Sequence, residues 1–427
     1  MKRETSAYER VMFFYSDKSP MYFAFCLKIE GNLTDDRMKD ALAKTAKVYP
    51  LSAVRVEKDE QKRQFITTED VPDFPLVLKD NFQGDWKDEV VLALQGHFDN
   101  STGPMARFVL LRSGKLNHII AVFHHAVCDG AGALLFLEEM LKFLADPLRK
   151  ALVPDENNWA PMLHKVISPD NLNKIKKFDL PPFATDKSYT KFEVQEKPYE
   201  PFPTLPFELQ TVSFTKDETS KLIDVAKKNG VTVHAYAGAL ILQCFAEEFG
   251  EKEGFTRTIQ SPINFRPQLV DGSEKMFGLF NGLVTAECDC SPGVKTEEIA
   301  RTIKSTFHSE IDSLKPLAGY YNFMTYFLEG IDDPELFYEN RKEGGTPMNY
   351  DFSFSNLGRV GLESKYGEYY LKEIYGPVFS AAKGERVIGA ITFDGKLFMT
   401  LIYDSACFDH QTGKRIWSKI RDRIMAL

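Results

Sequence analysis

The chain has 427 residues, of which 43% are hydrophobic and 27% are charged, a balance typical of globular proteins. This length exceeds what one hydrophobic core usually serves, so we expect two or three core-sized units. The formal net charge of -8 argues against a broad basic face of the kind that binds nucleic acid, and leaves room for a small local basic patch. The sequence contains no apolar run of about 18 residues that predicts a membrane span, and its N-terminus lacks the apolar segment of a signal peptide.

The cysteine and phenylalanine contents indicate the cellular location of the protein and the kind of core or cavity it contains. The six cysteines form neither a dense disulfide framework nor a zinc motif, since Cys288 and Cys290 are too close together and too isolated for one. We therefore expect reduced thiols and a cytoplasmic location. The 34 phenylalanines predict large aromatic cores or an aromatic-lined cavity.

Strand and helix patterns alternate through the first half of the chain. Residues 21–29 are rich in aromatic and branched side chains and predict a strand, and Thr34 then precedes a helically spaced apolar stripe as its expected N-cap. Residues 106–112 and 116–123 predict two strands joined by a hairpin turn. The broad apolar face of residues 130–145 predicts a buried helix.

The second half repeats this alternation after a proline-rich stretch. Residues 181–206 hold six prolines and predict a crossover between halves. Thr215 and Glu218 predict a capping box, and Asp394-Gly395 predicts a two-residue hairpin turn. The further strands and helices are expected at 209–214, 233–249 (a helix that ends at Gly250), 256–265, 296–314, 349–356, 367–374, 387–393 and 396–404, followed by a terminal helix with Trp417, Ile420 and Ile424.

These patterns predict a mixed α/β fold made of two comparable halves. We expect an N-terminal lobe at 1–180, the proline-rich crossover at 181–206 and a C-terminal lobe at 207–427. No repeat of individual residues relates the two halves.

The segment AVFHHAVCDG at 121–130 places two adjacent histidines at the end of an apolar run. A metal site is one interpretation, but adjacent side chains on a strand point to opposite faces, so His124 and His125 are poorly placed to bind one ion together. A pair of purely structural histidines is the second interpretation. The third is catalytic, because junctions of strand and helix are where mixed α/β folds place chemistry.

In the catalytic interpretation, one histidine faces the interior and the other faces a cleft. A histidine with an ordinary pKa near 6.5 suits a general base at neutral pH. Asp129 follows the second histidine by four residues, which leaves three roles open for it: an orienting partner of the histidine, a cap of the following helix, or the partner of a distant arginine.

The seven residues HHAVCDG at 124–130 resemble the HHxxxDG motif of the coenzyme A-dependent acyltransferase superfamily. This superfamily includes chloramphenicol acetyltransferase, the condensation domains of nonribosomal peptide synthetases, the Pap acyltransferases and the alcohol acetyltransferases. Further segments resemble this superfamily in the same order along the chain: PINFRP at 262–267, MFGLFNG at 276–282, SNLG at 355–358 and DGKL at 394–397. The resemblance is greatest to the branch of condensation domains, Pap proteins and alcohol acetyltransferases.

The resemblance implies a role for each matching residue. His125 is the implied catalytic base, and His124, Asp129, Gly130 and Arg266 are implied to shape the site, with Asp129 paired to Arg266 and Gly130 allowing substrate or backbone to approach closely. The residues expected to contact substrate, or equally to serve only the local structure, are Asn264, Ser355 and Asn356. No metal or redox cofactor is implied.

The resemblance also implies a fold and an activity. The fold is a V-shaped pseudo-dimer of two lobes resembling chloramphenicol acetyltransferase, complete as a monomer, with a central tunnel that holds His125. The activity is acyl transfer from acyl-coenzyme A or a phosphopantetheinyl carrier protein to a small alcohol or amine. Two alternatives stay open: a catalytically silent module that docks a carrier protein or partner enzyme, and a hydrolase that transfers the acyl group to water. A basic cluster at Lys174, Lys176 and Lys177 is either a solvated surface or a contact for the phosphates of coenzyme A.

Overall fold

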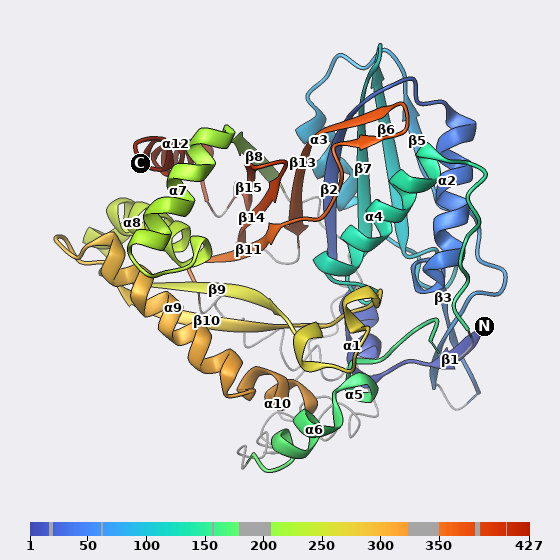
Figure 1. Cartoon of the computed structure of the whole chain (residues 1–427), viewed down its shortest axis with the longest axis horizontal. Helices are drawn as coiled ribbons and strands as arrows, with labels where there is room; N and C mark the ends of the chain where they lie inside the picture. Colours follow the sequence, from blue (N-terminus) through green and yellow to red (C-terminus); the bar gives the residue numbers. More distant parts are fainter. Residues whose placement is uncertain are drawn as a thin grey trace.

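The computed structural model describes residues 1–16, 20–60, 63–155, 158–178, 206–322, 350–380, 385–406 and 408–427. Within these ranges the strands form two six-stranded sheets and one three-stranded sheet, with helices packed against the larger two (Figure 1). The predicted mixed α/β class is confirmed. None of the helices in the described ranges is both long enough and apolar enough to cross a bilayer.

The first large sheet has the order β12-β13-β2-β7-β6-β5. Its strands are β2 (Tyr22–Glu30), β5 (Leu76–Lys79), β6 (Ala106–Ser113), β7 (Leu116–His124), β12 (Lys365–Tyr366) and β13 (Tyr369–Ser380). β5 runs parallel to β6, and the other neighbours are antiparallel. Helices α2 (Asp35–Val48) and α4 (Gly130–Ala145) pack together on one side of this sheet, while α3 (Trp86–Gln95) contacts β2 and β7.

The second large sheet has the order β10-β9-β11-β14-β15-β8. Its strands are β8 (Phe207–Ser213), β9 (Thr256–Asn264), β10 (Asn281–Asp289), β11 (Phe352–Arg359), β14 (Arg386–Phe393) and β15 (Lys396–Asp404). β11 runs parallel to both of its neighbours, which makes this sheet mixed as well. The helices that accompany it are α7 (Lys216–Lys228), α8 (Val233–Glu253), α9 (Thr296–Asp312) and α12 (His410–Met425).

Short elements complete the described part of the chain. The small sheet joins β1 (Lys2–Glu4), β4 (Gln64–Thr67) and β3 (Arg55–Lys58). The short helices are α1 (Ala7–Ser16), α5 (Leu163–Val166), α6 (Pro169–Ile175) and α10 (Lys315–Asn322), with 3₁₀ turns at Pro50–Ser52, Arg266–Gln268 and Ser273–Lys275.

Several local predictions are confirmed by the hydrogen bonds that begin or end an element. The side chain of Thr34 accepts a hydrogen bond from the N–H of Arg37 at the start of α2, and Thr215 and Glu218 form the expected capping box of α7. Asp394 and Gly395 both have positive φ, as the two central residues of a tight hairpin require. These side chains therefore set where their elements begin and turn.

The predicted end of a helix at Gly250 is wrong. Helix α8 continues to Glu253 and is followed by Gly254, whose φ is +83°. A Cβ on Gly250 would lie 2.3 Å from the Phe255 ring, so this glycine provides room for a packed aromatic side chain instead of ending the helix.

Strand β13 connects the two halves of the chain. It lies beyond residue 207 in the sequence, yet it pairs with β2 of the first sheet over most of its length. It also contacts β14 and β15 of the second sheet. The boundaries at 180 and 207 remain a prediction, and the strands are not divided between the sheets at those positions.

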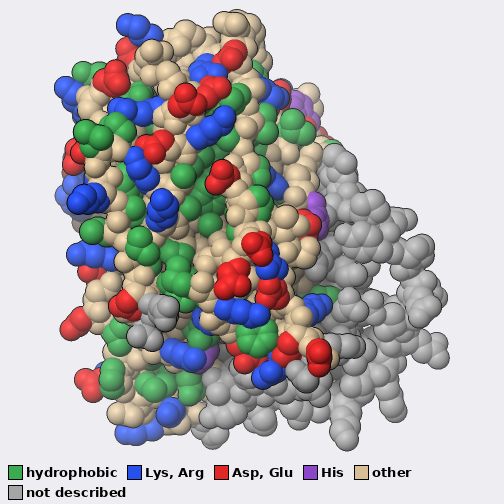
Figure 2. All heavy atoms as spheres, turned by 90° about the vertical axis from the view of Figure 1, so that its right-hand side faces the viewer, with side chains coloured by type: hydrophobic (Ala, Val, Ile, Leu, Met, Phe, Trp, Pro, Cys, Tyr) green, Lys and Arg blue, Asp and Glu red, His purple; other side chains and the backbone are tan. Residues whose placement is uncertain are grey.

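The outer face that carries α2 has a hollow of its own. A cavity of about 710 Å³ lies between α2 and the segment that leads into β5, with mainly apolar walls that include Leu42, Ala46, Phe74 and Leu76. Figure 2 shows this side of the molecule, where hydrophobic side chains gather among Lys, Arg, Asp and Glu. His125, Asp129 and Asn264 do not line this hollow and lie instead at a second cavity between the two halves.

Candidate active site

The two adjacent histidines end β7 and have different surroundings. His124 is fully buried among the rings of Phe13, Tyr22 and Phe98, and its Nδ1 accepts a hydrogen bond of 3.0 Å from the N–H of Ala126. Burial holds the pKa of His124 well below its ordinary value. This ring is therefore neutral near pH 7 and belongs to the packing of the first lobe.

His125 lies at the wall of a cavity. Its backbone N–H donates to the carbonyl of Met21 over 2.8 Å, and its ring packs between Phe23 and Phe379, whose centroids are 5.1 and 5.3 Å away. Burial lowers the pKa of His125, and the negative charge of Asp129 offsets part of this shift. The imidazole is therefore uncharged at neutral pH and able to accept a proton.

Asp129 fills two of the three roles left open by the sequence. Its Oδ1 accepts from the N–H of Gly132 over 2.8 Å and so caps α4. Its Oδ2 accepts from Nη1 of Arg266 over 2.8 Å and from the N–H of Phe280 over 2.9 Å. The expected ion pair with Arg266 is present, and the two side chains are only 5% and 4% exposed. Because both carboxylate oxygens are engaged in this way, the side chain is held away from a triad-like role.

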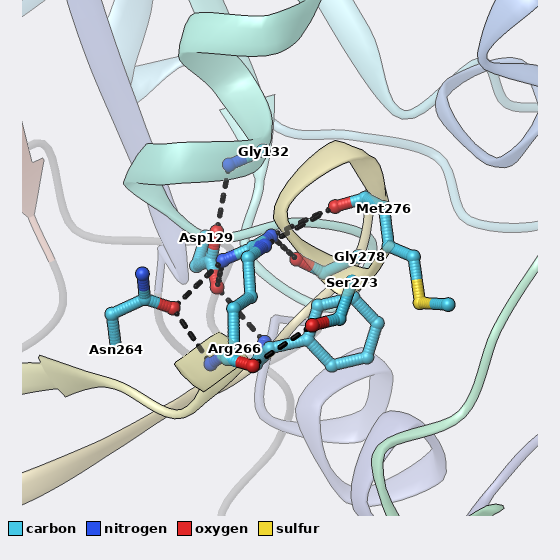
Figure 3. Close-up of polar contacts among 8 residues, drawn as sticks. Asp129, Gly132, Asn264, Arg266, Ser273, Met276 and Gly278 are labelled. Carbon is cyan, nitrogen blue, oxygen red and sulfur yellow. Dashed lines mark hydrogen bonds and ion pairs between the residues drawn. The ribbon is translucent and has the colours of Figure 1, made fainter. Parts of the chain in front are cut away.

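Arg266 ties the loop before β10 to the start of α4 (Figure 3). Besides Asp129, its guanidinium donates to the carbonyls of Met276 and Gly278 over 3.0 to 3.3 Å, and to Oδ1 of Asn264 over 3.2 Å. Its Cζ also lies 4.9 Å from the centroid of the Phe280 ring. The rigid fork of a guanidinium suits this set of acceptors, where lysine would provide one point charge.

The cavity lies between the two halves and has a volume of about 480 Å³, within the usual range for small-molecule sites. The first half provides apolar lining residues, which include Met12, Met21, Phe23 and Leu134. The strands of the second sheet provide polar ones: Gln260, Asn264, Asn281, Ser353, Ser355 and Asn356. Apolar residues of the second sheet, among them Leu283 and Val387, also line the cavity, so His125 faces a space that offers both apolar surface and polar groups.

The predicted substrate-binding residues all line this cavity. Asn264 directs its Oδ1 to the backbone N–H and the guanidinium of Arg266. Asn356 directs its Oδ1 to the N–H of Gly358 over 2.8 Å, at a point where the register between β11 and β14 shifts. Ser355 precedes it on the same strand. The carbonyl oxygens of both amides thus serve the local structure.

Gly130 has a different neighbour from the one expected. A Cβ at this position would lie 3.1 Å from a methyl group of Leu357 on β11. The close approach that glycine permits here is therefore by an apolar side chain of the second half, where we expected substrate or backbone. Gly130 also lines the cavity.

Some residues of the cavity were not predicted. The hydroxyls of Tyr8 on α1 and Tyr320 on α10 form a hydrogen bond of 2.5 Å that links the two halves. The hydroxyl of Tyr350 donates a hydrogen bond of 2.9 Å to Glu385. No local pattern marks these residues, because each is brought to the cavity by an element distant in sequence. The lysine cluster of residues 174–177 is not among the residues that line the cavity, and its role stays a prediction.

Among the described residues, no group of three or more His, Cys, Asp or Glu side chains is arranged to hold a metal ion. The five described cysteines are free thiols and buried, and Cys407 lies outside the described residues. Burial raises the pKa of Cys128, which is next to the Asp129 carboxylate. This thiol is protonated and suited to packing, not to nucleophilic attack.

Comparison with known proteins now gives this arrangement a context. Residues 203–334 match the family model of the phthiocerol/phthiodiolone dimycocerosyl transferase C-terminus. Among solved structures, a trichothecene 15-O-acetyltransferase from Fusarium sporotrichioides aligns with a TM-score of 0.74 at 12% identity, covering 100% of this chain and 94% of that one. The chain has the fold of the coenzyme A-dependent acyltransferase superfamily. The resemblance expected from the motifs is confirmed.

Other solved structures align over similar lengths. Polyketide synthase associated protein 5 from Mycobacterium tuberculosis has a TM-score of 0.66 at 13% identity, covering 99% of this chain and 97% of that one. The starter condensation domain of rhizomide synthetase, solved in complex with C8-CoA, has a TM-score of 0.66 at 12% identity, covering 100% and 95%. No curated protein matches the chain by sequence.

Proposed function

We propose that this protein is an acyltransferase that moves an acyl group from a thioester to a hydroxyl or amine of a small acceptor, with His125 as the general base. The observation that carries the proposal is a neutral imidazole at the wall of a cavity between the two halves, on the fold of this superfamily. The family model that matches residues 203–334 is named for a transferase, and a solved structure with the same fold is an O-acetyltransferase.

The chemistry follows from the position of the base. The acceptor oxygen or nitrogen attacks the thioester carbon while His125 takes its proton, and the carbon becomes tetrahedral. The C–S bond then breaks, and the leaving thiolate takes the proton from the imidazolium. Proton transfer by a positioned base typically contributes a factor of about 10² to 10⁴ in rate. Orientation in the cavity and stabilisation of the oxyanion must supply the rest.

Ser355 and Asn356 are the proposed polar contacts near the reacting carbon. The carbonyl oxygen of Asn356 is held by Gly358, so its NH₂ group is the part of the side chain left to donate. A hydroxyl and an amide N–H on the same strand are suitable donors to an oxyanion. The proposed donor is acyl-coenzyme A or an acyl group on a phosphopantetheinyl carrier protein, and C8-CoA bound to a structure of the same fold supports the thioester class.

The test measures thiol release from a panel of acyl-coenzyme A thioesters with pooled alcohols and amines. His125→Ala is compared with the wild type, and His308→Ala, which removes an exposed histidine of α9, is the matched control. We expect acceptor-dependent release that falls by a factor of about 10² to 10⁴ in His125→Ala and is unchanged in the control.

Other outcomes separate the alternatives. Equal release by His125→Ala and the wild type would contradict the assignment of the base. Thiol release without any acceptor would favour a hydrolase. Absence of release from both free thioesters and thioesters on carrier proteins would favour a silent docking module, for which binding to a carrier protein is the next measurement.

A further inference from the structure

Asn264 and Asn281 form a cross-strand pair at the end of the second sheet, at the wall of the catalytic cavity. Asn264 is the last residue of β9 and Asn281 the first of β10, and the antiparallel register places them directly opposite each other. Opposite residues of an antiparallel pair direct their side chains to the same face, with their Cβ atoms about 5 Å apart. Both residues line the cavity that holds His125.

The two amides offer complementary groups. Oδ1 of Asn264 accepts hydrogen bonds from the backbone N–H and the guanidinium of Arg266. Figure 3 shows the side-chain amide nitrogen of Asn264 pointing away from Arg266. Asn264 therefore has its NH₂ group to donate. Oδ1 of Asn281 is buried and accepts no hydrogen bond from any described residue. Buried acceptors without a donor are rare in folded proteins, and one at the wall of a cavity points to a donor on the ligand.

The buried ion pair holds this couple in place. Arg266 orients Asn264, while Asp129 accepts from the N–H of Phe280, the residue directly before Asn281. Phe265 and Phe280 then join the two strands through a backbone hydrogen bond of 2.8 Å. The Asp129–Arg266 pair therefore fixes the backbone on both sides of the amide couple as well as the start of α4.

We infer that the Asn264–Asn281 couple binds a secondary amide of the substrate, namely an amide of the pantetheine arm that carries the thioester. A secondary amide presents a carbonyl oxygen to the NH₂ of Asn264 and an N–H to Oδ1 of Asn281. This inference rests on the proposed function, because it takes the thioester donor from it. Coenzyme A and the prosthetic group of a carrier protein share this arm, so the couple recognises the chemistry common to both.

The first experiment measures binding without turnover. The probe is S-methylpantetheine, a thioether that contains both amides and no acyl group, titrated by calorimetry into the wild type, Asn281→Leu and Asn281→Ala. Loss of one hydrogen bond predicts about tenfold weaker binding for both variants. Gln411→Leu is the control, because it removes an exposed amide of α12 that does not line the cavity, and it is expected to bind as the wild type does. Thermal unfolding shows whether each variant is folded.

The second experiment compares two small donors, the acetyl thioesters of N-acetylcysteamine, which has one amide, and of 2-mercaptoethanol, which has none. We expect Asn281→Leu to lower kcat/KM about tenfold for the first donor and to leave the second unchanged. An equal loss of kcat/KM for both donors would mean that the two asparagines contact the acceptor or the acyl group, and would overturn the inference.

The two proposals fail in different ways. Failure of the wild type to bind S-methylpantetheine, or equal binding by the wild type and both Asn281 variants, would overturn the amide-binding couple even if acyl transfer is found. Binding that depends on Asn281 in a protein that releases no thiol would support the couple and contradict the proposed transferase activity.

Discussion

At the scale of single residues, His125 and His124 show how burial divides two identical side chains between two tasks. Both have a lowered pKa because burial disfavours the charged imidazolium. His124 is enclosed by aromatic rings, whereas His125 is the one that reaches the cavity. The proposed base is thus in its reactive, uncharged form over a wider pH range than a histidine in water.

This difference predicts the pH dependence of the reaction. The folded protein has a pKa for His125 below the ordinary 6.5, so the base is protonated, and activity lost, only when the pH falls below that value. We expect kcat/KM for an acyl thioester to fall as the pH is lowered, with its acid midpoint below 6.5. Steady-state kinetics with far-UV circular dichroism at each pH checks this, and an acid midpoint above 6.5 in a folded protein would contradict it.

Removing one charge of the buried ion pair has a predictable cost. Asp129→Asn leaves the Arg266 guanidinium buried without its counter-ion, and such changes typically cost about 3 to 5 kcal/mol. We expect the free energy of unfolding in urea to fall by that amount. Lys216→Ala, which breaks an exposed ion pair with Asp394, is the control and is expected to cost less than about 1 kcal/mol. Similar losses in the two variants would show that the buried pair contributes little to stability.

At the scale of elements, local signals predicted well and distant contacts did not. Thr34, Thr215 and the Asp394-Gly395 turn were predictable because each acts within three or four residues of its own position. The prediction at Gly250 was wrong because a glycine is required there for another reason: the ring of Phe255, which lies beyond the end of the helix, packs against this position.

The candidate site divides in the same way. The motif at 124–130 marked His125 and Asp129, and the resemblance supplied Arg266 as the partner of Asp129. The second role of Asp129 as the cap of α4 was left open until the geometry showed both roles together. Tyr8 and Tyr320 reach the cavity through tertiary packing, for which their local sequence carries no signal. Asn281 lies in the segment 276–282 that resembled the superfamily, but the sequence indicated no role for it, because its pairing with Asn264 depends on the strand register.

The contact between the two large sheets depends on a glycine. A Cβ on Gly389 of β14 would lie 2.3 Å from the carbonyl oxygen of Pro377 on β13 and 2.6 Å from Oγ1 of Thr400. Gly389→Ala must therefore push β13 and β14 apart, and overpacking of this kind typically costs about 1 to 3 kcal/mol. Because Pro377 lines the cavity, we also expect weaker binding of substrate.

Thermal unfolding and thioester kinetics of Gly389→Ala check this expectation. Gly319→Ala is the control, because this glycine lies in α10 with no atom within 4 Å of a built Cβ. Alanine there is expected to be neutral or stabilising by up to about 1 kcal/mol. An unchanged melting temperature for Gly389→Ala would show that the sheets can shift without cost.

At the scale of the whole molecule, buried histidines make folding sensitive to mild acid. Burial lowers the pKa of His118, His124 and His125, and lowers that of His234 to about 4. Well above pH 6.5 these groups are neutral in both the folded and the unfolded chain. As the pH falls below 6.5, the unfolded chain takes up protons that the folded chain does not, so the folded state loses stability down to about pH 4.

Urea unfolding at a series of pH values tests this coupling. We expect the midpoint to fall steadily from pH 6.5 to 4, and His234→Gln to reduce the slope. His308→Ala removes an exposed histidine and is expected to leave the slope unchanged. A midpoint that is constant across this pH range would mean that the histidine rings are protonated without unfolding.

Strand β13 has a consequence for how the chain reaches its native state. Its partner β2 is synthesised long before β13, so β2 leaves the ribosome while most of the residues between the two strands have still to be made. Until then β2 has β7 on one side and an unpaired edge on the other, and such edges invite pairing with other chains. The pairing of β13 with β2 is therefore the last to form in the first sheet, and because the two strands are far apart in sequence, this contact slows folding. A fragment that ends before β13 should consequently aggregate where the full chain stays dispersed.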